Sequence, residues 1–318
     1  MIRAAGFAGA VCRSSASRST GRSRAFIILA CLVAGAAGAL RGESPVQDPV
    51  EVQVILTVTD RQDRYIDGLA AQNLVLKESG VPQAITSVTP IGSEPVAMSL
   101  LVDTSNSLEE HFTAVQAAAI EVARRLRPGD SAEVLRFASG VHRELSFTGD
   151  VTRIEQVIRG LRRSGSTSLH NAVYVSLRER EGLPASGGAN APRHVLVLFS
   201  DGHDTSSLMP VRELQEVVRR SASVLYAVAP HGRDLKGGHA VLRSLSHTTS
   251  GRAYIPPYRL EPGLLADRLW LDIAHHQLLR YISSHTARDG AWRRIDIHSG
   301  VSGVNVRARE GYFAPRAK

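Results

Sequence analysis

The chain has 318 residues, of which 43% are hydrophobic and 21% are charged, a composition typical of a folded globular protein. Its formal net charge of +8 owes much to residues 1–39, which hold five arginines and no acid, so that 33 basic and 30 acidic residues remain beyond them. No run of Lys and Arg with interleaved aromatic residues lies in that remainder, which argues against nucleic-acid binding.

The first residues have the features of an export signal. A basic stretch ends at Arg24, an apolar run rich in Ala and Gly follows, and Ala37–Ala39 fits the small-residue cleavage pattern. The run is short for a membrane span, which needs about 20 strongly apolar residues. We therefore predict a signal peptide over residues 1–39, a linker over 40–49, and export to the periplasm or the exterior. A retained N-terminal membrane anchor is the alternative.

Both cysteines of the chain, Cys12 and Cys31, lie in this leader. After cleavage the chain would hold no disulfide, no cysteine metal ligand and no cysteine nucleophile. Its stability would then have to come from a packed core, which a chain of this length can supply.

The segment after the linker is predicted to be all β. Val50–Thr59 alternates apolar and polar residues, which is the pattern of a half-buried strand. Turns at Asp67–Gly68 and Ser79–Pro82 separate two further short strands, Leu74–Glu78 and Ala84–Thr89.

From Pro95 the pattern changes to alternating strands and helices. Two apolar runs, Val96–Val102 and His194–Ser200, are predicted to be buried central strands, and an aspartate follows each directly. A loop is predicted over residues 182–192. The other predicted strands are 131–138, 142–147, 223–229 and 252–255, and the predicted helices are 109–126, 151–161, 168–180, 211–220, 240–250 and 262–279. This alternation predicts an α/β fold, with a mostly parallel sheet covered on both faces.

The chain returns to β structure at its end, with strands predicted over residues 279–284, 292–298 and 304–309. Asp289–Gly290 is a hairpin signal between the first two of these strands. Three short strands make a marginal unit by themselves. We therefore expect residues 50–94 and 279–315 to pack together as one β-sandwich, into which the α/β domain of residues 95–278 is inserted.

Three predicted loops carry side chains that could bind a metal through oxygen. Asp103, Ser105 and Ser107 follow the first buried strand, Thr167 precedes a helix, and Asp201 follows the second buried strand. In a parallel α/β sheet such loops meet at the carboxyl edge, where these folds bind ligands. Two carboxylates balance a 2+ charge and hydroxyls add neutral oxygens, which suits Mg²⁺, with Mn²⁺ or Ca²⁺ as alternatives. The absence of His and Cys from this set argues against zinc and copper.

These residues also form a motif in three parts. D-x-S-x-S at Asp103, G-S-T-x-L over Gly165–Leu169 and S-D-G over Ser200–Gly202 resemble, in order and spacing, the metal-ion-dependent adhesion site (MIDAS) of the von Willebrand factor type A (VWA) family. The resemblance covers about residues 95–275. It implies a Rossmann-like domain with a mostly parallel six-stranded sheet. Ser166 departs from the pattern, because a second glycine is usual there.

The resemblance also implies roles for the site residues. Asp201, Ser105 and Ser107 would touch the metal directly or through water, and Thr167 would exchange between these two modes. Three segments, Glu78–Gln83, Ser200–Thr205 and Arg307–Tyr312, look like signatures of a secreted bacterial VWA-related family, which extends the resemblance over nearly the whole mature chain.

Each of these residues also has a simpler interpretation. Ser107, Ser166 or Thr167 could cap the helix that follows it, and Asp201 with Gly202 could form a plain turn. All three loops in this order, each at the same predicted sheet edge, favour the metal site.

Other polar residues near these loops are weaker candidates. Asp204 could add an outer contact to the metal ligands, but a solvated loop acid is the favoured interpretation, and His111, His170 and His203 are interpreted as surface or loop histidines. Gly129–Ser131 resembles an esterase block but lacks the G-x-S-x-G elbow.

We expect the site to bind and not to catalyse, so that the chain is not an enzyme. At least one coordination position would stay open for an Asp or Glu of an unknown extracytoplasmic partner, as in cation-dependent adhesion. One alternative is an envelope structural or assembly component whose cation only ties the loops together. Another is a metal-dependent hydrolase, which would need His203 or His170 as its acid–base group. We expect no nucleic-acid partner, and membrane contact only if the N-terminal segment is retained.

Overall fold

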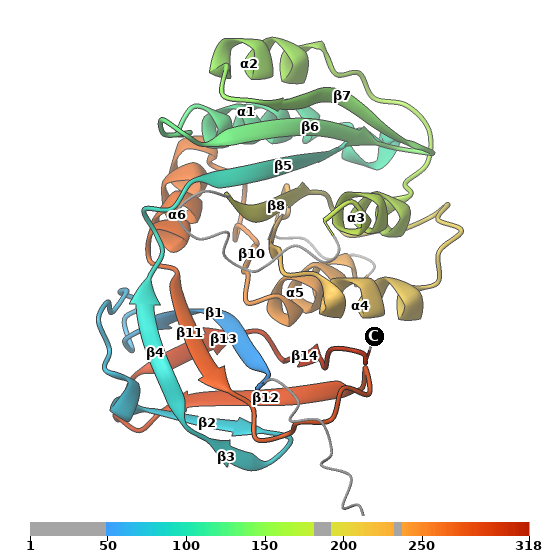
Figure 1. Cartoon of the computed structure of the whole chain (residues 1–318). Helices are drawn as coiled ribbons and strands as arrows, with labels where there is room; N and C mark the ends of the chain where they lie inside the picture. Colours follow the sequence, from blue (N-terminus) through green and yellow to red (C-terminus); the bar gives the residue numbers. More distant parts are fainter. Residues whose placement is uncertain (1–48, 181–191, 232–236, 318) are drawn as a thin grey trace, which may run out of the picture. The chain divides into compact units, whose positions relative to one another are not determined.

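Three β-sheets and six α-helices make up residues 49–180, 192–231 and 237–317, which are the residues that the computed structural model describes (Figure 1). One sheet has six strands and the other two have four strands each. The predicted signal peptide, both cysteines, nearly all of the predicted linker and nearly all of the predicted loop over 182–192 lie outside the described residues.

The six-stranded sheet has the order β10-β9-β8-β5-β6-β7 and is parallel except for the antiparallel β6–β7 pair. Its strands are β5 (Val96–Asp103), β6 (Ser131–Phe137), β7 (Val141–Thr148), β8 (Arg193–Phe199), β9 (Val224–Val228) and β10 (Ala253–Tyr254). β5 pairs with β8 in register up to Val102 and Phe199, so their carboxyl ends lie side by side. The predicted α/β fold is thereby confirmed, and the two aspartates that follow these strands meet at one edge.

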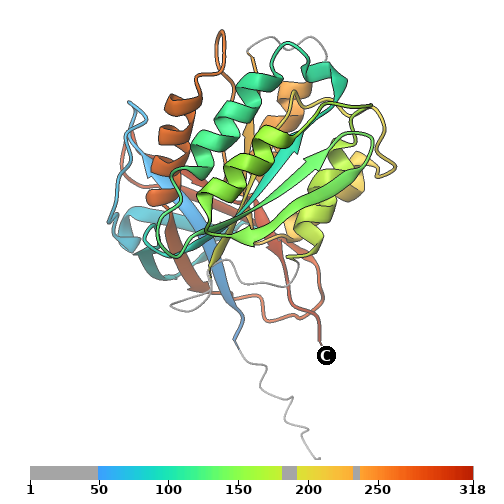
Figure 2. The same ribbon diagram turned by 90° about the horizontal axis from the view of Figure 1, so that it is seen from above.

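Helices cover both faces of this sheet (Figure 2). Because successive side chains of a strand point to opposite faces, Leu100 packs in one core and Leu101 in the other. The first core includes α1 (Phe112–Ala123), α2 (Val151–Gly160) and α6 (Pro262–Ala274), and the second includes α3 (Leu169–Arg178), α4 (Val211–Arg220) and α5 (Gly238–Thr248). Each fully buried Leu or Val contributes about 1.5–3 kcal/mol, so this double burial holds β5 firmly in place.

The two flanks build two antiparallel sheets, with the orders β13-β1-β11-β4 and β14-β12-β2-β3. Their strands are β1 (Glu51–Thr59), β2 (Leu74–Glu78), β3 (Val81–Gln83), β4 (Ile85–Pro90), β11 (Gln277–Ile282), β12 (Trp292–Ser299), β13 (Asn305–Ala308) and β14 (Gly311–Phe313). Leu56, Leu76, Leu279 and Ile295 share one core, so strands before and after the α/β domain form one sandwich, as predicted. The exact domain boundaries stay predictions.

A buried carboxylate joins the last helix of the α/β domain to the sandwich. Asp272, near the end of α6, is fully buried and accepts two hydrogen bonds from Arg307 of β13, at 2.7 and 2.6 Å. The hydroxyls of Tyr65 and Tyr226 also donate to it, each at 2.6 Å. Burial is the largest influence on the pKa of Asp272 and acts to raise it, but the charges of Arg307 and His276 and the hydrogen bonds from Arg307 and Tyr226 together outweigh burial, so the pKa is lowered. The end of α6 is thus bound to the sandwich by an ion pair.

Two predicted helices differ from the observed ones. The helix predicted over residues 109–126 is the shorter α1, and a 3-10 turn, η2 (Asn106–Leu108), precedes it. The helix predicted over residues 262–279 ends at Ala274, because β11 already begins at Gln277. The short elements η1 (Ala71–Asn73), β3 and β14, of three residues each, were not predicted.

The predicted hairpin at Asp289–Gly290 is wrong. β11 pairs with β1 and β4, whereas β12 pairs with β2 and β14, so the connecting chain crosses from one sheet to the other. The reason is burial: Leu278 and Leu279, which point to opposite faces of β11, are both fully buried, so β11 takes a central place between two other strands. Among the described residues, no helix has the length and apolar character needed to cross a membrane.

Candidate metal centre

The first loop of the candidate site begins at the carboxyl end of β5. The Asp103 side chain is fully buried, and its Oδ1 accepts the Ser105 N–H at 2.9 Å. Its Oδ2 accepts the Ser200 hydroxyl at 2.7 Å, which links the first loop to the third. The Ser105 and Ser107 hydroxyl oxygens are 3.0 Å apart. Since Ser105 is buried and Ser107 is exposed, these oxygens lead from the buried carboxylate to the surface.

The second loop is joined to the first by its backbone. Ser164 N–H donates to the Thr104 carbonyl at 2.8 Å, and Asn106 N–H donates to the Gly165 carbonyl at 3.2 Å. Gly165 has φ +72°, and a Cβ there would lie 2.3 Å from Ser139 Oγ, so the turn requires glycine. These contacts bring the buried Thr167 to the edge that carries Asp103.

Ser166, where the resemblance predicts a second glycine, adds polar contacts to the loop. Its hydroxyl lies 3.0 Å from Ser139 Oγ and donates to Ser206 Oγ at 2.9 Å, and its N–H donates to Ser139 Oγ at 3.1 Å. The departure therefore ties the second loop more closely to its neighbours.

The third loop follows β8 and contains Asp201, which is 8% exposed. Asp201 Oδ1 accepts the His203 N–H at 3.0 Å. Gly202 has φ +84°, and a Cβ there would lie 2.2 Å from the Gly238 carbonyl oxygen. Only glycine fits both the backbone conformation and this close approach, so the S-D-G part of the motif has a steric basis.

Further along the chain, the third loop is joined to the second loop by hydrogen bonds. Thr205 N–H and Ser206 N–H donate to the Thr167 carbonyl at 2.8 and 3.0 Å, and Thr167 N–H donates to Thr205 Oγ1 at 2.9 Å. Sequence reasoning did not assign roles to Ser200, Thr205 or Ser206. The run of hydroxyl residues after Gly202 was the available signal, because Ser and Thr favour such local turns.

The environment of Asp204 differs from the predicted one. Asp204 was predicted to be a solvated loop acid, yet its Oδ2 accepts the His170 N–H at 2.9 Å, at the start of α3, and its Oδ1 accepts the Ser207 N–H at 3.0 Å. Burial acts to raise the pKa of Asp204, but these hydrogen bonds outweigh it and the pKa is lowered. The carboxylate lies where the α3 dipole and its free amides favour negative charge.

Burial raises the pKa of Asp103 to about 7, and the nearby charge of Asp201 adds to this effect, whereas the hydrogen bonds from Ser105 and Ser200 oppose it. Over residues 49–180, 192–231 and 237–317, Asp103 forms no ion pair with a basic side chain. Two carboxylates near each other at a buried edge repel, which destabilises their charged forms. A bound divalent cation would instead make these charges favourable.

The donor chemistry fits such a cation. Asp103 and Asp201 supply charge, and Ser105, Ser107 and Thr167 supply neutral oxygens, which a hard cation accepts. No group of three or more His, Cys, Asp or Glu that could hold an ion was found in the described part of the chain, so hydroxyls have to complete this donor set.

The three candidate histidines have other contacts. His203 Nδ1 lies 3.7 Å from Asp201 Oδ2, and His170 Nδ1 lies 3.7 Å from Asp204 Oδ2 and 3.2 Å from the Met209 carbonyl oxygen. The His111 ring packs against His231, with centroids 4.5 Å apart. His111 and His203 lie in loops, as interpreted, whereas His170 is the second residue of α3.

Comparisons with known proteins give a family match and several similar solved structures. Residues 98–203 match the family model described as the von Willebrand factor type A domain. Similar solved structures include proximal thread matrix protein 1 from the mussel byssus (12% identity, 60% of this chain, 49% of that chain, TM-score 0.47) and BatB from Bacteroides thetaiotaomicron (11%, 56%, 97%, 0.44). A third is a von Willebrand factor type A protein from Catenulispora acidiphila (13%, 85%, 75%, 0.47). The match thus spans about half of the mussel protein. No curated protein matches the chain.

Proposed function

We propose that the domain containing residues 98–203, which match the von Willebrand factor type A (VWA) family model, holds one divalent cation and uses it to bind a partner protein. Asp103, Ser105, Ser107, Thr167 and Asp201 would hold the ion, with Mg²⁺ as the first choice and Mn²⁺ or Ca²⁺ as alternatives. The observation that carries the proposal is the hydrogen-bond network that draws all three loops to one sheet edge, around a buried Asp103.

The partner group is proposed to be a carboxylate. The two carboxylates of the protein set are buried and a neutral hydroxyl, that of Ser107, lies at the surface, so a bound divalent ion would keep positive character on its solvent side. An Asp or Glu side chain from another protein would add a hard oxygen ligand and a negative charge. The exposed Ser107 marks where such a side chain would approach.

A binding role is favoured over a purely structural ion. The loops are already joined pairwise, the first to the second by backbone hydrogen bonds, the second to the third at Thr167, and the first to the third through Ser200 and Asp103. A cation is therefore not needed to tie them. The hydrolase alternative has less support, because His203 is engaged by Asp201 of its own loop and His170, in α3, is engaged by Asp204 of the third loop.

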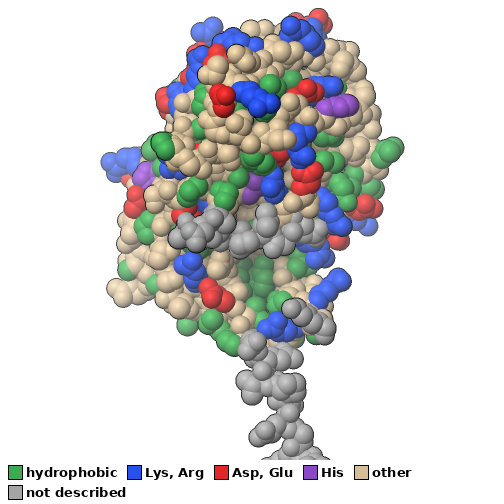
Figure 3. Space-filling model, turned by 45° about the horizontal axis from the view of Figure 1, so that its top comes forward, with side chains coloured by type: hydrophobic (Ala, Val, Ile, Leu, Met, Phe, Trp, Pro, Cys, Tyr) green, Lys and Arg blue, Asp and Glu red, His purple; other side chains and the backbone are tan. Residues whose placement is uncertain are grey.

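We propose an exported protein that acts in extracytoplasmic adhesion or interaction. On the face seen in Figure 3, basic and acidic side chains are interspersed and do not gather by sign, which supports a protein partner over a nucleic acid.

The test uses Mn²⁺ as the probe ion. Titration is expected to show one Mn²⁺ per chain, competed by Mg²⁺, and Asp103→Ala and Asp201→Ala should abolish it. Asp204→Ala is the matched control, because its carboxylate lies in the same loop as Asp201 but caps α3, and it should still bind the ion.

Acetate then tests the open coordination position. By displacing water from the bound Mn²⁺, acetate should lower the enhancement of water proton relaxation. Unchanged relaxation at saturating acetate would favour the structural ion, and equal Mn²⁺ binding by Asp103→Ala would end the proposal.

A further inference from the structure

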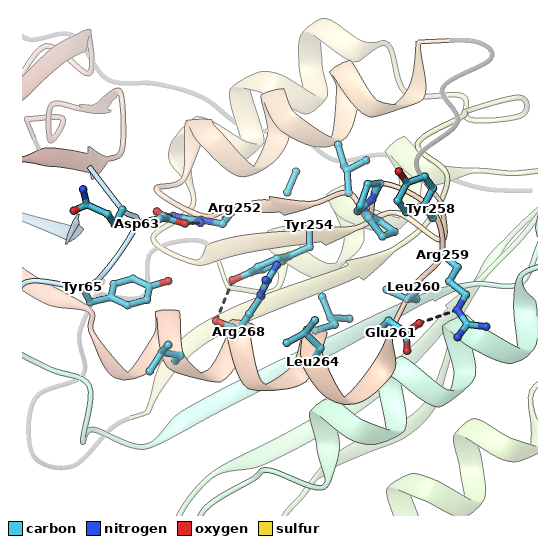
Figure 4. A pocket seen from close by; sticks show the side chains of 17 residues that line it. Asp63, Tyr65, Arg252, Tyr254, Tyr258, Arg259, Leu260, Glu261, Leu264 and Arg268 are labelled. Carbon is cyan, nitrogen blue, oxygen red and sulfur yellow. Dashed lines mark hydrogen bonds and ion pairs between the residues drawn. The ribbon is translucent and has the colours of Figure 1, made fainter. Parts of the chain in front are cut away.

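A groove of about 870 Å³ lies between β10 and α6 (Figure 4). One wall is formed by Arg252 to Leu260, which include β10 and the chain after it, and the other by the outer face of α6. Tyr65 lies toward one end and Tyr258 toward the other. The groove uses none of the proposed metal ligands.

The α6 wall is apolar with one charge in its middle. Leu264, Arg268 and Leu271 are four and three residues apart, so they share one helix face. Leu264 and Leu271 are 53% and 50% exposed, and Tyr258, across the groove, is 89% exposed. This is a cluster of large apolar side chains at one site, in contrast to a single exposed leucine, which needs no explanation.

The other wall presents an unpaired sheet edge. β10 is the last strand of the six-stranded sheet, and it pairs only with β9, through the carbonyls of Arg252 and Tyr254. Since successive backbone groups of a strand alternate in direction, the amides of Ala253 and Ile255 point away from β9. Neither amide donates a hydrogen bond to another group among the described residues. Pro256 and Pro257 lack an N–H, so the free edge is short.

The charges of the groove favour an acidic occupant. Arg252 is paired with Asp63 at 2.6 and 2.9 Å, and Arg259 with Glu261 at 2.8 Å. Arg268 is exposed and has no ion-pair partner within the ranges that the structure describes. It therefore offers one free positive charge between two exposed leucines.

We propose that this groove binds a short extended peptide of a partner protein, which carries one acidic side chain flanked by apolar ones. The peptide adds to the edge of β10 through the Ala253 and Ile255 amides, as in β-strand addition. Its carboxylate pairs with Arg268 and its apolar side chains cover Leu264, Leu271 and Tyr258. The site is separate from the metal centre, so the two can bind two points of one partner.

The test uses a panel of five acetylated, amidated pentapeptides of Leu and Val in which one Asp moves through the five positions. Saturable binding of at least one peptide to the full chain is expected in EDTA, with a dissociation constant below about 1 mM. Replacing its Asp by Asn should weaken binding about fivefold, as should Arg268→Gln. Arg243→Gln, an exposed arginine of α5, is the matched control and should leave binding unchanged.

Two further measurements test the apolar wall and the strand edge. Leu271→Ser should weaken binding about tenfold, whereas Leu208→Ser, at a leucine that is 92% exposed outside the groove, should not. In amide hydrogen exchange followed by NMR, the peptide should protect Ala253 and Ile255.

Three outcomes would overturn the proposal. They are no saturable binding by any peptide, equal binding by Arg268→Gln and Leu271→Ser, and protection that spares both amides. Self-association of the chain that Leu271→Ser abolishes, without peptide binding, would instead assign the groove to a second copy. Because the assay is run in EDTA, its failure is distinct from failure of the metal proposal.

Discussion

Replacing Asp103 with asparagine is expected to stabilise the EDTA-treated protein and to remove its stabilisation by Mg²⁺. The two effects share one cause, the charge of a carboxylate that is fully buried beside Asp201. Without a cation this charge is costly, and with a cation it is the main attraction. Asparagine keeps the shape and one acceptor oxygen but removes the charge.

The magnitude follows from the pKa of Asp103, which burial raises from 3.8 to about 7. Between these values the folded chain binds more protons than the unfolded chain, so the free energy of unfolding falls as pH rises from about 4 to about 7. A pKa difference of about 3 corresponds to about 4 kcal/mol. Asparagine gives up about 1–2 kcal/mol in hydrogen bonding to Ser105 and Ser200. The net gain at pH 8 is therefore about 2–3 kcal/mol.

Urea unfolding in EDTA and in saturating Mg²⁺, at several pH values from 5 to 8, measures both effects. In EDTA the unmodified protein should lose stability toward pH 8, while Asp103→Asn should not. In saturating Mg²⁺ only the unmodified protein should gain stability against urea. Asp204→Asn is the control with the opposite sign, because the pKa of Asp204 is lowered and its charge is favourable. It should be less stable in both conditions and should keep the Mg²⁺ response.

The reasoning is refuted if Asp103→Asn is destabilised in EDTA at pH 8 to the same degree as Asp204→Asn. It is also refuted if Asp103→Asn keeps the full Mg²⁺ response, because the ion would then bind elsewhere.

Three other substitutions test the surrounding structure by urea unfolding. Gly202→Ala should lower the free energy of unfolding by at least about 2–3 kcal/mol, because of the positive φ and the close contact at this position. Gly68→Ala, at φ +70° with open space around it, should cost about 1 kcal/mol. Equal costs would contradict the steric argument. Arg307→Met should lower the free energy of unfolding by about 3–5 kcal/mol, because it leaves Asp272 buried and unpaired. Adding Asp272→Asn should restore part of this stability. No restoration would point to lost packing as the cause. Ser166→Gly should cost about 1–2 kcal/mol and leave the Mn²⁺ affinity within about twofold; a large loss of affinity would make Ser166 part of the metal site.

The sequence predicts strands and helices well where a long period or apolar run exists. β2 (Leu74–Glu78) and α4 (Val211–Arg220) have the predicted bounds, and the buried runs before Asp103 and Asp201 are central strands. β14 was missed because three residues show no period. The Asp289–Gly290 hairpin failed because a turn signal is local, whereas the partners of β11 are chosen by burial on both of its faces.

The candidate site is also predicted only in part by the sequence. The motif predicts which residues lie at the sheet edge, because strand ends in a parallel sheet converge. It does not predict the hydrogen bond from Ser200 to Asp103 or the clasp between Thr205 and Thr167, since these depend on how two loops meet in space. Asp204 was misinterpreted for the same reason, because its partners lie on α3 and in its own loop.

Arg193 lies where the chain enters and leaves the α/β domain, at the end of β8 opposite the proposed binding edge. It is the first residue of β8, and its Nη2 donates to the carbonyls of Gly92, before the α/β domain, and Ile273, at its end, at 3.3 and 3.4 Å. Its Nη1 lies 2.6 Å from Nδ1 of the buried His276. Burial lowers the pKa of Arg193 to about 10, so it stays charged at neutral pH and needs these acceptors. The far end of β8, about 20 Å away at about 3.3 Å per residue, leads into Ser200 and Asp201. One strand thus separates the point where the chain enters and leaves from the edge where a partner would bind.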